Sequence, residues 1–453
     1  MATGIPRKRP NRDRGSSAQP RSDRPVDVVL SYPGKLSEAE VLQGREGTFV
    51  SLWPEVVEER VTNRLYCSDN LPVLLSLLND KAVRGNVRLV YIDPPFSTGS
   101  IFQSRSQVDA YTDLVSGADF IEHLRRRLIV LRELLANDGS IYVHLDDNMV
   151  AQIKIVMDEV FGSDQFRNLI TRKKCNPKNY TRKAFGNVSD FILFYTKSDD
   201  YVWSRPIEPW TEERALKEYE YIDRETGRRF KKVPVHAPGV RNGATGKLWR
   251  GKLPPPGKHW QYTPANLDEM DSRGEIFWSS NGNPRRKVYL DQSEGVGVQD
   301  MWLAFRDAHN QNVRVTGYPT EKNQDLLKRI ILASSAKGDL VLDCFSGSGT
   351  TLAAAEELGR NWIGVDSSVE AIRTTLNRFA YGRAPMGDFV AKSPVEKSAP
   401  ATLSLFPTET DRAKKRNSHT PISDFALFGT SPRNPELTKA VRRWNRTLPK
   451  TQG

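Results

Sequence analysis

The sequence contains few of the residues that build disulfide frameworks and zinc sites. Its 453 residues include only three cysteines, Cys67, Cys175 and Cys344, which are far apart and form no CxxC pair. The six histidines show no spacing typical of metal ligands. These absences argue against a disulfide scaffold and against a bound zinc ion, and they favour a reducing cytosol as the setting.

Long hydrophobic stretches are also missing. No apolar run approaches the roughly 18 residues that a membrane span needs, and the N-terminus lacks the apolar core of a signal peptide. We therefore expect a soluble cytoplasmic protein with no membrane partner.

Positive charge is in excess. The chain carries 67 Lys and Arg against 55 Asp and Glu, a net charge of +12, which suits a polyanionic partner. Part of the excess lies in residues 1–25, a basic tail rich in Pro, Ser and Gly that we expect to be disordered.

The most informative stretch is a short apolar strand, 88–92, that runs into Asp93-Pro94-Pro95-Phe96. A carboxylate and a backbone carbonyl, from Asp93 and Pro94, can each accept one hydrogen of an exocyclic amino group on a nucleobase. The two prolines restrict the backbone before them, so both acceptors are oriented in advance. Phe96 offers a face on which a flipped-out base can stack. The alternative is a strand that ends in an ordinary Pro-Pro stop.

Strands alternate with helices on both sides of this stretch, which predicts an α/β domain with a mainly parallel, Rossmann-like sheet. The predicted strands are 64–67, 88–92, 140–145, 190–197, 340–345 and 362–366. The predicted helices are 71–79, 118–137, 149–161, 320–335, 352–358 and 369–379. The polar residues 97–118 are long enough to form a mobile loop over a site.

This alternation divides into a first part, 26–200, and a second part, 316–382, around residues 201–315. The intervening region holds six of the nine tryptophans, interleaved with basic clusters. Such a mixture suits base stacking and phosphate contact, which favours a region facing nucleic acid. The alternative is a subdomain whose tryptophans form its core, and both can hold. Residues 383–453 are expected to be a linker and a C-terminal extension.

A second informative stretch is the turn Ser346-Gly347-Ser348-Gly349-Thr350, which joins a strand to a helix N-terminus. It lacks the Lys of a phosphate-binding loop and the third Gly of the dinucleotide fingerprint. Asp366 lies 19 residues beyond Gly347, where an acid can hold the hydroxyls of a ribose. The turn therefore indicates a nucleoside-bearing ligand without a pyrophosphate, for which S-adenosylmethionine is suitable. The alternative is a glycine turn beside an N-capping acid.

The motifs DPPF, LDCFSGSGTT and IGVD resemble those of the amino-methylating DNA methyltransferases, which act on adenine N6 or cytosine N4. Because DPPF precedes the glycine turn, with a long region between them, the order resembles the circularly permuted β group. The segments GSIYVHLDDNMVAQIKIVMDEVFG and SDFILFYTK are similar to type III restriction-modification Mod subunits and their solitary relatives. The resemblance covers roughly residues 60–200 and 315–380, and it implies that residues 201–315 are a target-recognition insert.

The resemblance also implies roles for individual residues. The catalytic residues would be Asp93, Pro94, Pro95 and Phe96. The cofactor would be held by Asp69 at its adenine, by Asp366 at its ribose, by Lys322 near its carboxylate, and by Asp343, Phe345, Gly347 and Gly349 at its methionine part. The chain departs from the family where Asn323 follows Lys322, because the family usually has Pro there.

The function that the resemblance implies is transfer of a methyl group from S-adenosylmethionine to adenine N6 in double-stranded DNA. Cytosine N4 is the first alternative, and a catalytically silent DNA-binding specificity subunit is the second. Methylation of RNA or of a protein amine is a third. A homodimer and a restriction subunit stay open as partners.

Overall fold

The computed structural model describes residues 28–54, 62–95, 101–103, 109–112, 117–176, 183, 185–307, 314–316, 321–385, 421–431 and 434–446. It consists of two compact units. Unit 1 contains the described residues of 1–204, 300–392 and 419–453, and unit 2 contains residues 205–299. The expected insert, 201–315, extends beyond unit 2 at both ends.

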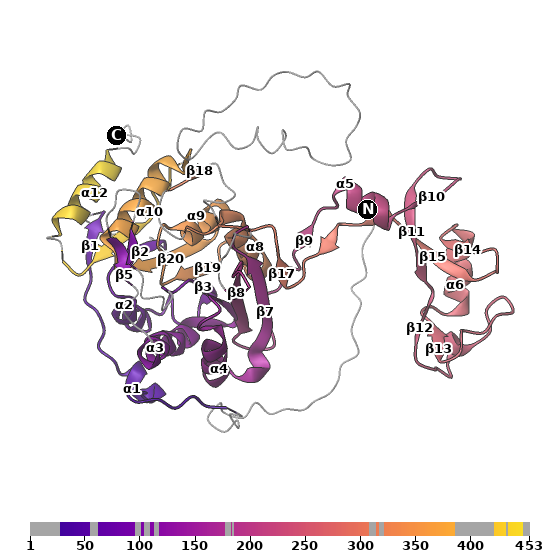
Figure 1. The fold of residues 1–453 in the computed structure, drawn as a ribbon, viewed down its shortest axis with the longest axis horizontal. Coiled ribbons are helices and arrows are strands. Elements are labelled where there is room, and N and C mark those ends of the chain that lie inside the picture. The colour runs from indigo at the N-terminus through magenta and orange to yellow at the C-terminus, as the bar shows by residue number, and fades with distance from the viewer. Residues whose placement is uncertain are drawn as a thin grey trace, which may run out of the picture. The chain divides into compact units, whose positions relative to one another are not determined.

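Unit 1 is built on a mixed sheet (Figure 1). Among the described residues its order is β1-β22-β2-β20-β19-β3-β6-β8-β7-β17. The strands are β1 (Val50–Trp53), β2 (Arg64–Cys67), β3 (Val87–Ile92), β6 (Leu135–Leu145), β7 (Phe166–Lys173), β8 (Ser189–Thr196), β17 (Met301–Trp302), β19 (Leu340–Asp343), β20 (Asn361–Asp366) and β22 (Ala426–Gly429).

The centre of this sheet is parallel, as the alternation of strands and helices predicts. Strands β22, β2, β20, β19, β3 and β6 all run the same way. Strand β8 is antiparallel to both β6 and β7, and β1 is antiparallel to β22. Four of these strands, β1, β7, β17 and β22, have no counterpart among the predicted elements. The C-terminal extension thus contributes β22 to the interior of the sheet.

Helices cover both faces of the sheet. They are α1 (Glu38–Leu42), α2 (Asn70–Leu77), α3 (Ala118–Leu134), α4 (Val150–Phe161), α8 (Gln324–Ser334), α9 (Thr350–Glu357), α10 (Val369–Tyr381) and α12 (Pro435–Asn445), with the short 3-10 helix η2 (Ser163–Gln165) after α4. Ile363 and Val365 of β20 pack in a core with α2, α3 and α4. Successive residues of a strand point to opposite faces, and Trp362, which directly precedes Ile363, meets Phe379 of α10 and Phe425. Within the described residues, no helix is both long and apolar enough to cross a membrane.

Helix α8 begins later than its apolar pattern predicts. The prediction was 320–335, but the helix spans Gln324–Ser334 because Asn323 is its N-cap. The Asn323 side chain accepts a hydrogen bond from the Asp325 backbone N–H at 2.9 Å, which satisfies one of the free donors of the first turn. Asparagine at this position is therefore compatible with a sharp helix start. Thr320 lies outside the described residues.

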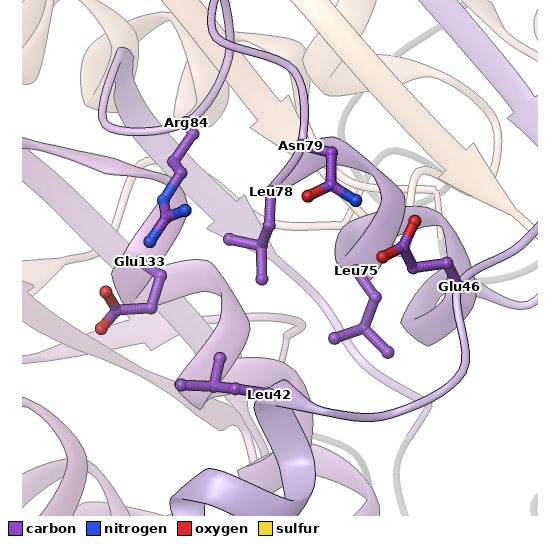
Figure 2. A pocket seen from close by; sticks show the side chains of 7 residues that line it. All are labelled: Leu42, Glu46, Leu75, Leu78, Asn79, Arg84 and Glu133. Atoms are coloured by element: carbon purple, nitrogen blue, oxygen red, sulfur yellow. The ribbon is translucent and has the colours of Figure 1, made fainter.

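The N-terminal segment, residues 28–54, is ordered well before residue 64, where the sequence pattern predicts the first element. Helix α1 has a capping box formed by Ser37 and Glu40. Where the segment passes α2 and the end of α3 it leaves a pocket of about 190 Å³ (Figure 2). The pocket is lined by Leu42, Glu46, Leu75, Leu78, Asn79, Arg84 and Glu133.

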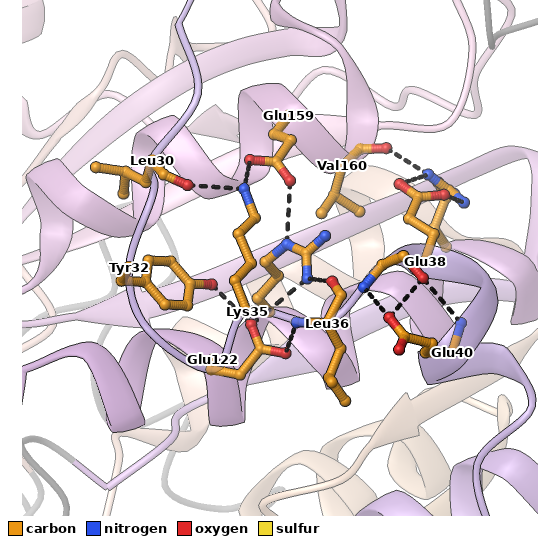
Figure 3. Close-up of polar contacts among 12 residues, drawn as sticks. Leu30, Tyr32, Lys35, Leu36, Glu38, Glu40, Glu122, Glu159 and Val160 are labelled. Carbon is orange, nitrogen blue, oxygen red and sulfur yellow. Dashed lines mark hydrogen bonds and ion pairs between the residues drawn. The ribbon is translucent and has the colours of Figure 1, made fainter.

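Ion pairs hold the N-terminal segment against α3 and α4 (Figure 3). The Lys35 ammonium lies 2.8 Å from Glu159 Oε2, and Arg125 Nε lies 3.1 Å from Glu159 Oε1. Tyr32 donates a hydrogen bond of 2.7 Å to Glu122 Oε2. Single surface ion pairs are weak, but these share partners and are partly buried, so the contacts fix the segment.

The polar region 97–118, predicted as a mobile loop, contains a backbone hairpin of β4 (Ile101–Gln103) and β5 (Asp109–Thr112). The other residues of 97–116 lie outside the described residues. A second small pair is β18 (Arg314–Val315) with β21 (Ala384–Pro385).

Unit 2 contains a four-stranded antiparallel sheet in the order β10-β11-β15-β14 and two small pairs, β12-β13 and β16-β9. Its elements are β9 (Ile207–Glu208), α5 (Glu212–Glu218), β10 (Tyr221–Ile222), β11 (Arg229–Pro234), β12 (His236–Pro238), η3 (Ala244–Gly246), β13 (Lys258–Trp260), α6 (Pro264–Ser272), β14 (Ile276–Trp278), β15 (Pro284–Tyr289), η4 (Leu290–Gln292) and β16 (Val296–Gly297).

The core of unit 2 is built from tryptophans. Trp249 and Trp260 are buried with Leu267, and Trp278 stacks on Trp249 with ring centroids 5.1 Å apart. The alternative in which tryptophans form a subdomain core therefore holds for these three residues. Trp203 and Trp302, by contrast, belong to unit 1.

Candidate active site

Four acidic residues lie at the carboxyl ends of four adjacent parallel strands, in the order β2, β20, β19 and β3. Asp366 and Asp343 end β20 and β19, Asp93 directly follows β3, and Asp69 stands two residues beyond β2. In open α/β sheets ligands bind at this edge. The tertiary structure thus brings together acids that come from widely separated parts of the chain.

Asp93 presents one paired and one unpaired oxygen. Its Oδ2 lies 3.0 Å from the Lys322 ammonium, and its side chain is 17% exposed. Its Oδ1 is buried and has no hydrogen-bond partner among the described residues. A buried acceptor without a donor is costly, so such an atom is a candidate for contact with a ligand. Pro94 is buried and Pro95 half-buried beside it, whereas Phe96 lies outside the described residues.

Asp343 is a carboxyl group that ionises near neutral pH. Its burial raises its pKa to about 7, and the negative charges of Asp93 and Asp366 act in the same direction. Hydrogen bonds from Thr351 and from the Phe345 backbone N–H, the latter 3.0 Å long, partly oppose the rise. A cationic group brought next to Asp343 would therefore favour its ionised form.

Asp366 holds the glycine turn in place. Its Oδ2 accepts a hydrogen bond from Gly347 N–H at 2.8 Å, and its Oδ1 accepts one from Ser368 N–H at 2.9 Å. Burial raises the pKa of this carboxyl group. Gly349 has φ +70°, and a Cβ there would come within 2.7 Å of Thr375, so only glycine fits.

The chemistry of this edge suits the cofactor inferred from the sequence. Carboxylates beside an open turn suit hydroxyl groups, amines and a positively charged sulfonium, all of which S-adenosylmethionine carries, and they repel phosphates. Asp69 is a further acid at this edge, and its side chain is 62% exposed, so a ligand can reach it. Asp69 also caps α2 by accepting a hydrogen bond from Leu71 N–H at 3.1 Å. In the described part of the chain, no group of three or more His, Cys, Asp or Glu side chains could hold a metal ion.

Sequence reasoning missed the residue that supports Asp69. Arg127 of α3 is buried and donates a hydrogen bond of 2.8 Å to Asp69 Oδ1, and it also bonds the Asn70 side chain. A signal was present in the sequence, because Arg127 falls on the apolar face of the helix with Leu124 and Leu131.

A buried polar network beneath Asp93 was also missed. The Tyr91 hydroxyl lies 2.8 Å from His144 Nδ1, and His144 Nε2 lies 3.4 Å from Asp190 Oδ2. Arg172 Nη1 is 3.1 Å from the same Asp190 oxygen. Burial is the main cause that lowers the pKa of His144, and the Lys322 charge adds to it, so this imidazole is neutral near pH 7. Among the described residues His144 Nε2 is buried without a hydrogen-bond partner, so the network is not fully satisfied.

None of the residues assigned from the sequence lines the pocket in Figure 2, which lies at the N-terminal segment. The structure thus brings together Asp93 with Lys322, and Asp343 with Phe345 and Asp366. These contacts lie at the sheet edge and not at that pocket.

A family model and several known proteins are similar to this chain. The family model described as "DNA methylase", of the N6/N4 type, matches residues 87–377. The type II methyltransferase M.EcaI of Enterobacter cloacae is 46% identical over 419 residues, which are 92% of this chain and 91% of that protein. The type III StyLTI Mod subunit of Salmonella typhimurium is 27% identical over 67% of this chain, which spans about half of that subunit. Among solved structures, the M1.HpyAVI–SAM complex is 16% identical, with a TM-score of 0.38, over 70% of this chain and 98% of that one.

Proposed function

The chain belongs to the N6/N4 family of DNA methylases, and from this premise we propose that it is a site-specific methyltransferase that methylates adenine N6 of a base flipped out of duplex DNA. The order of its motifs, with DPPF before the glycine turn, supports the circularly permuted arrangement of the β group. In this proposal unit 1 performs the chemistry and unit 2 belongs to the target-recognition region.

The observation that carries the proposal is the state of Asp93. One carboxylate oxygen is occupied by Lys322, and the other is buried without a partner among the described residues at the edge of the sheet. An amino nitrogen whose lone pair is delocalised into a nucleobase ring is a poor nucleophile. Oδ1 of Asp93 and the Pro94 carbonyl can each accept one of its hydrogens, which directs the lone pair outward. Phe96 completes the motif as the face on which the base stacks.

S-adenosylmethionine is the methyl donor, and when bound it supplies an electrophilic methyl group on a sulfonium. Asp366 would accept hydrogen bonds from the ribose hydroxyls and Asp69 from the adenine amino group. Asp343, Phe345, Gly347 and Gly349 would surround the methionine part. Lys322 is the remaining residue of the assigned set, and its ion pair with Asp93 links the cofactor side of the site to the amine.

The chemistry of the chain is mainly positioning, because the leaving group comes with the cofactor. Asp93 acts as a hydrogen-bond acceptor that orients the nitrogen. The nitrogen becomes acidic only after it has been methylated, so its proton can leave to water later. No strong base is needed in the site.

Unit 2 offers exposed cations for DNA phosphates. Lys258 of β13 and Arg285 of β15 are exposed. Both lie near His236 of β12. Burial is the main cause that lowers the pKa of that imidazole, and the charges of Lys258 and Arg285 lower it further. Three strands therefore bring basic side chains to one place, and we infer that this cluster contacts the DNA backbone.

Cytosine N4 is the second candidate substrate, because the same two acceptors can hold either amine. Aspartate as the first residue of the motif favours adenine by resemblance to the family. A second copy of the chain and a restriction subunit are the partners that remain to be sought for such a modification enzyme.

The test is mass spectrometry of nucleosides from the DNA of a methylation-deficient host that expresses the protein or its Asp93→Ala variant. N6-methyladenine only with the intact protein is the expected result. N4-methylcytosine would keep the mechanism and change the base. Neither mark, with the protein folded and expressed, would contradict the proposal and favour a silent binding subunit.

A further inference from the structure

The segment Glu321-Lys322-Asn323 consists of three polar residues that are all buried, and the next residue, Gln324, is buried as well. Charged residues are almost never fully buried without partners. The segment directly precedes α8, and Asn323 fixes its end by capping that helix. Each of the other two residues pairs with a charge on a different part of the site.

Glu321 pairs with an arginine that also holds the glycine turn. Its Oε1 lies 2.5 Å from Arg378 Nη2, and both side chains are almost fully buried. Arg378 Nε donates a hydrogen bond of 2.7 Å to the Ser348 carbonyl, and Nη2 donates one of 3.0 Å to Thr350 Oγ1. A single guanidinium group thus joins the glycine turn, which contains Ser348 and Thr350, to the segment that carries Lys322.

Lys322 pairs with the carboxylate of the DPPF motif. Its ammonium lies 3.0 Å from Asp93 Oδ2, and its side chain is buried. The ion pair leaves Oδ1 as the oxygen without a partner among the described residues. The lysine therefore determines which oxygen of Asp93 is left to accept a hydrogen from the amine.

The two pairs form one connected path. It runs from the glycine turn through Arg378 and Glu321 to the neighbouring Lys322, and from there to Asp93. Breaking a buried ion pair on one side leaves an uncompensated charge, so each member depends on the next. A displacement of the glycine turn would therefore change the position of the Asp93 carboxylate.

We propose that Lys322 is a positioning residue for Asp93, and that the buried Glu321–Arg378 pair holds it in place and couples it to the glycine turn. The inference rests on the proposed role of Asp93 in orienting the target amine. It differs from the role that the family resemblance assigns to Lys322, which is contact with the carboxylate end of the cofactor.

The first experiment separates these two roles with Lys322→Met. The matched control is Lys328→Met, because Lys328 also pairs with an acid, Glu357, but is partly exposed on α8. Calorimetry gives the affinity for S-adenosylmethionine. Single-turnover transfer of labelled methyl groups to unmethylated host DNA, at saturating cofactor and DNA, gives the rate.

We expect Lys322→Met to lower the transfer rate by roughly 10- to 100-fold, the size of loss that misplacement of a reacting group causes. Its cofactor affinity should change little, and Lys328→Met should resemble the wild type in both measurements. Weaker cofactor binding with an unchanged rate at saturation would overturn the proposal in favour of a cofactor contact. An unchanged rate with unchanged affinity would overturn it as well.

The second experiment tests the coupling with a double-mutant cycle of Lys322→Met and Glu321→Gln on the transfer rate. Once Lys322 is absent, Glu321→Gln should cost little more, so the two effects should be non-additive. Arg373→Gln, at an exposed arginine of α10 that pairs with Glu370, is the control and should add independently. Additive effects of the first pair would contradict the coupling. If Glu321→Gln does not fold, Arg378→Lys takes its place in the cycle.

The wild type distinguishes failure of this inference from failure of the proposed function. If the intact protein transfers no methyl group, the proposed function fails. The ion pair is then tested without activity, by a cycle of Asp93→Asn and Lys322→Met on the midpoint of thermal unfolding. Non-additive shifts support the pair, and additive shifts overturn it.

Discussion

The two units of this protein differ in how deeply some of their arginines and lysines are buried. In unit 1, Arg378 and Arg172 are buried, and each pairs with a carboxylate close to the sheet edge that forms the site. In unit 2, Arg228 and Lys232 are half-buried and lie over aromatic rings, 3.8 Å from the Tyr289 centroid and 3.4 Å from the Tyr221 centroid, and Arg228 also pairs with Asp291. Buried pairs fix atoms in place, whereas surface cations stay in contact with water and salt.

Aromatic residues show the same contrast. In unit 1 the core is mainly aliphatic, and it also contains Tyr66, Phe120, Phe161 and Tyr195. In unit 2 the small core depends on Trp249 and Trp260, which are buried against each other with ring centroids 5.8 Å apart. The difference shows that Trp249 and Trp260 serve the small core of unit 2. These two buried rings are not accessible for base stacking.

The largest effect is expected from removing the acid of the DPPF motif. Asp93→Ala should lower methyl transfer at least about 10³-fold, because a preorganised hydrogen bond at the reacting centre is removed. Its affinity for S-adenosylmethionine should be largely retained. Asp268→Ala is the control in unit 2, where Asp268 pairs with Arg250 at the surface. Radiolabelled methyl transfer and calorimetry measure both, and near-normal turnover by Asp93→Ala would refute its assignment.

A large effect on stability is expected from the core of unit 2. Trp260→Ala should destabilise that unit by about 3–5 kcal/mol, because it removes a large buried side chain. Hydrogen exchange on the full chain should show faster exchange in residues 205–299 and little change in unit 1. Trp203→Ala, at a tryptophan that is 47% exposed, is the milder control. Loss of cofactor binding in Trp260→Ala would show that the two units are not independent.

A smaller effect is expected from the titration of Asp343, whose pKa is raised to about 7. The carboxyl is neutral below this pH and ionised above it, and a sulfonium prefers the ionised form. Affinity for S-adenosylmethionine should therefore rise with pH, by about tenfold from about pH 6 to about pH 8, because the ionised fraction rises by that factor.

Asp343→Asn is the control for this titration. In this variant the cofactor ionises as before, but the side chain at position 343 no longer ionises. Calorimetry across the pH range should give a flatter profile for the variant. Identical profiles for the two proteins would show that Asp343 does not titrate in the site.

The smallest effect is expected from the exposed cations of unit 2. Replacing Lys258 and Arg285 by alanine should weaken DNA binding and reduce the slope of log affinity against log salt by about one for each phosphate that is no longer neutralised. Cofactor affinity should not change. Arg273→Ala, at an exposed arginine paired with Glu269, controls for the removal of a positive charge. An unchanged salt slope in fluorescence anisotropy would exclude this cluster from the DNA contact.

Local sequence pattern was sufficient to predict the strands and the turn that carry the candidate site. Strands β3 and β20 are short apolar runs followed by Asp93 or ended by Asp366, and the turn at Gly347 and Gly349 is evident from its composition. Strands β1, β7, β17 and β22 escaped prediction. Of these, β1, β17 and β22 are very short and gain stability mainly from neighbours distant in the chain. Strand β22, for example, pairs in register with Arg64–Cys67.

The sequence by itself determined the α/β class, the acids at the strand ends, the glycine turn and the family, because each depends on residues that lie within a few positions of one another. Only the tertiary structure decided that Lys322 meets Asp93, that Arg378 bonds the glycine turn, and that Trp249 and Trp260 form a core. The physical reason is the same in each case. An ion pair or a packed core depends on side chains from segments far apart in sequence, and no local period or motif specifies which of them will meet.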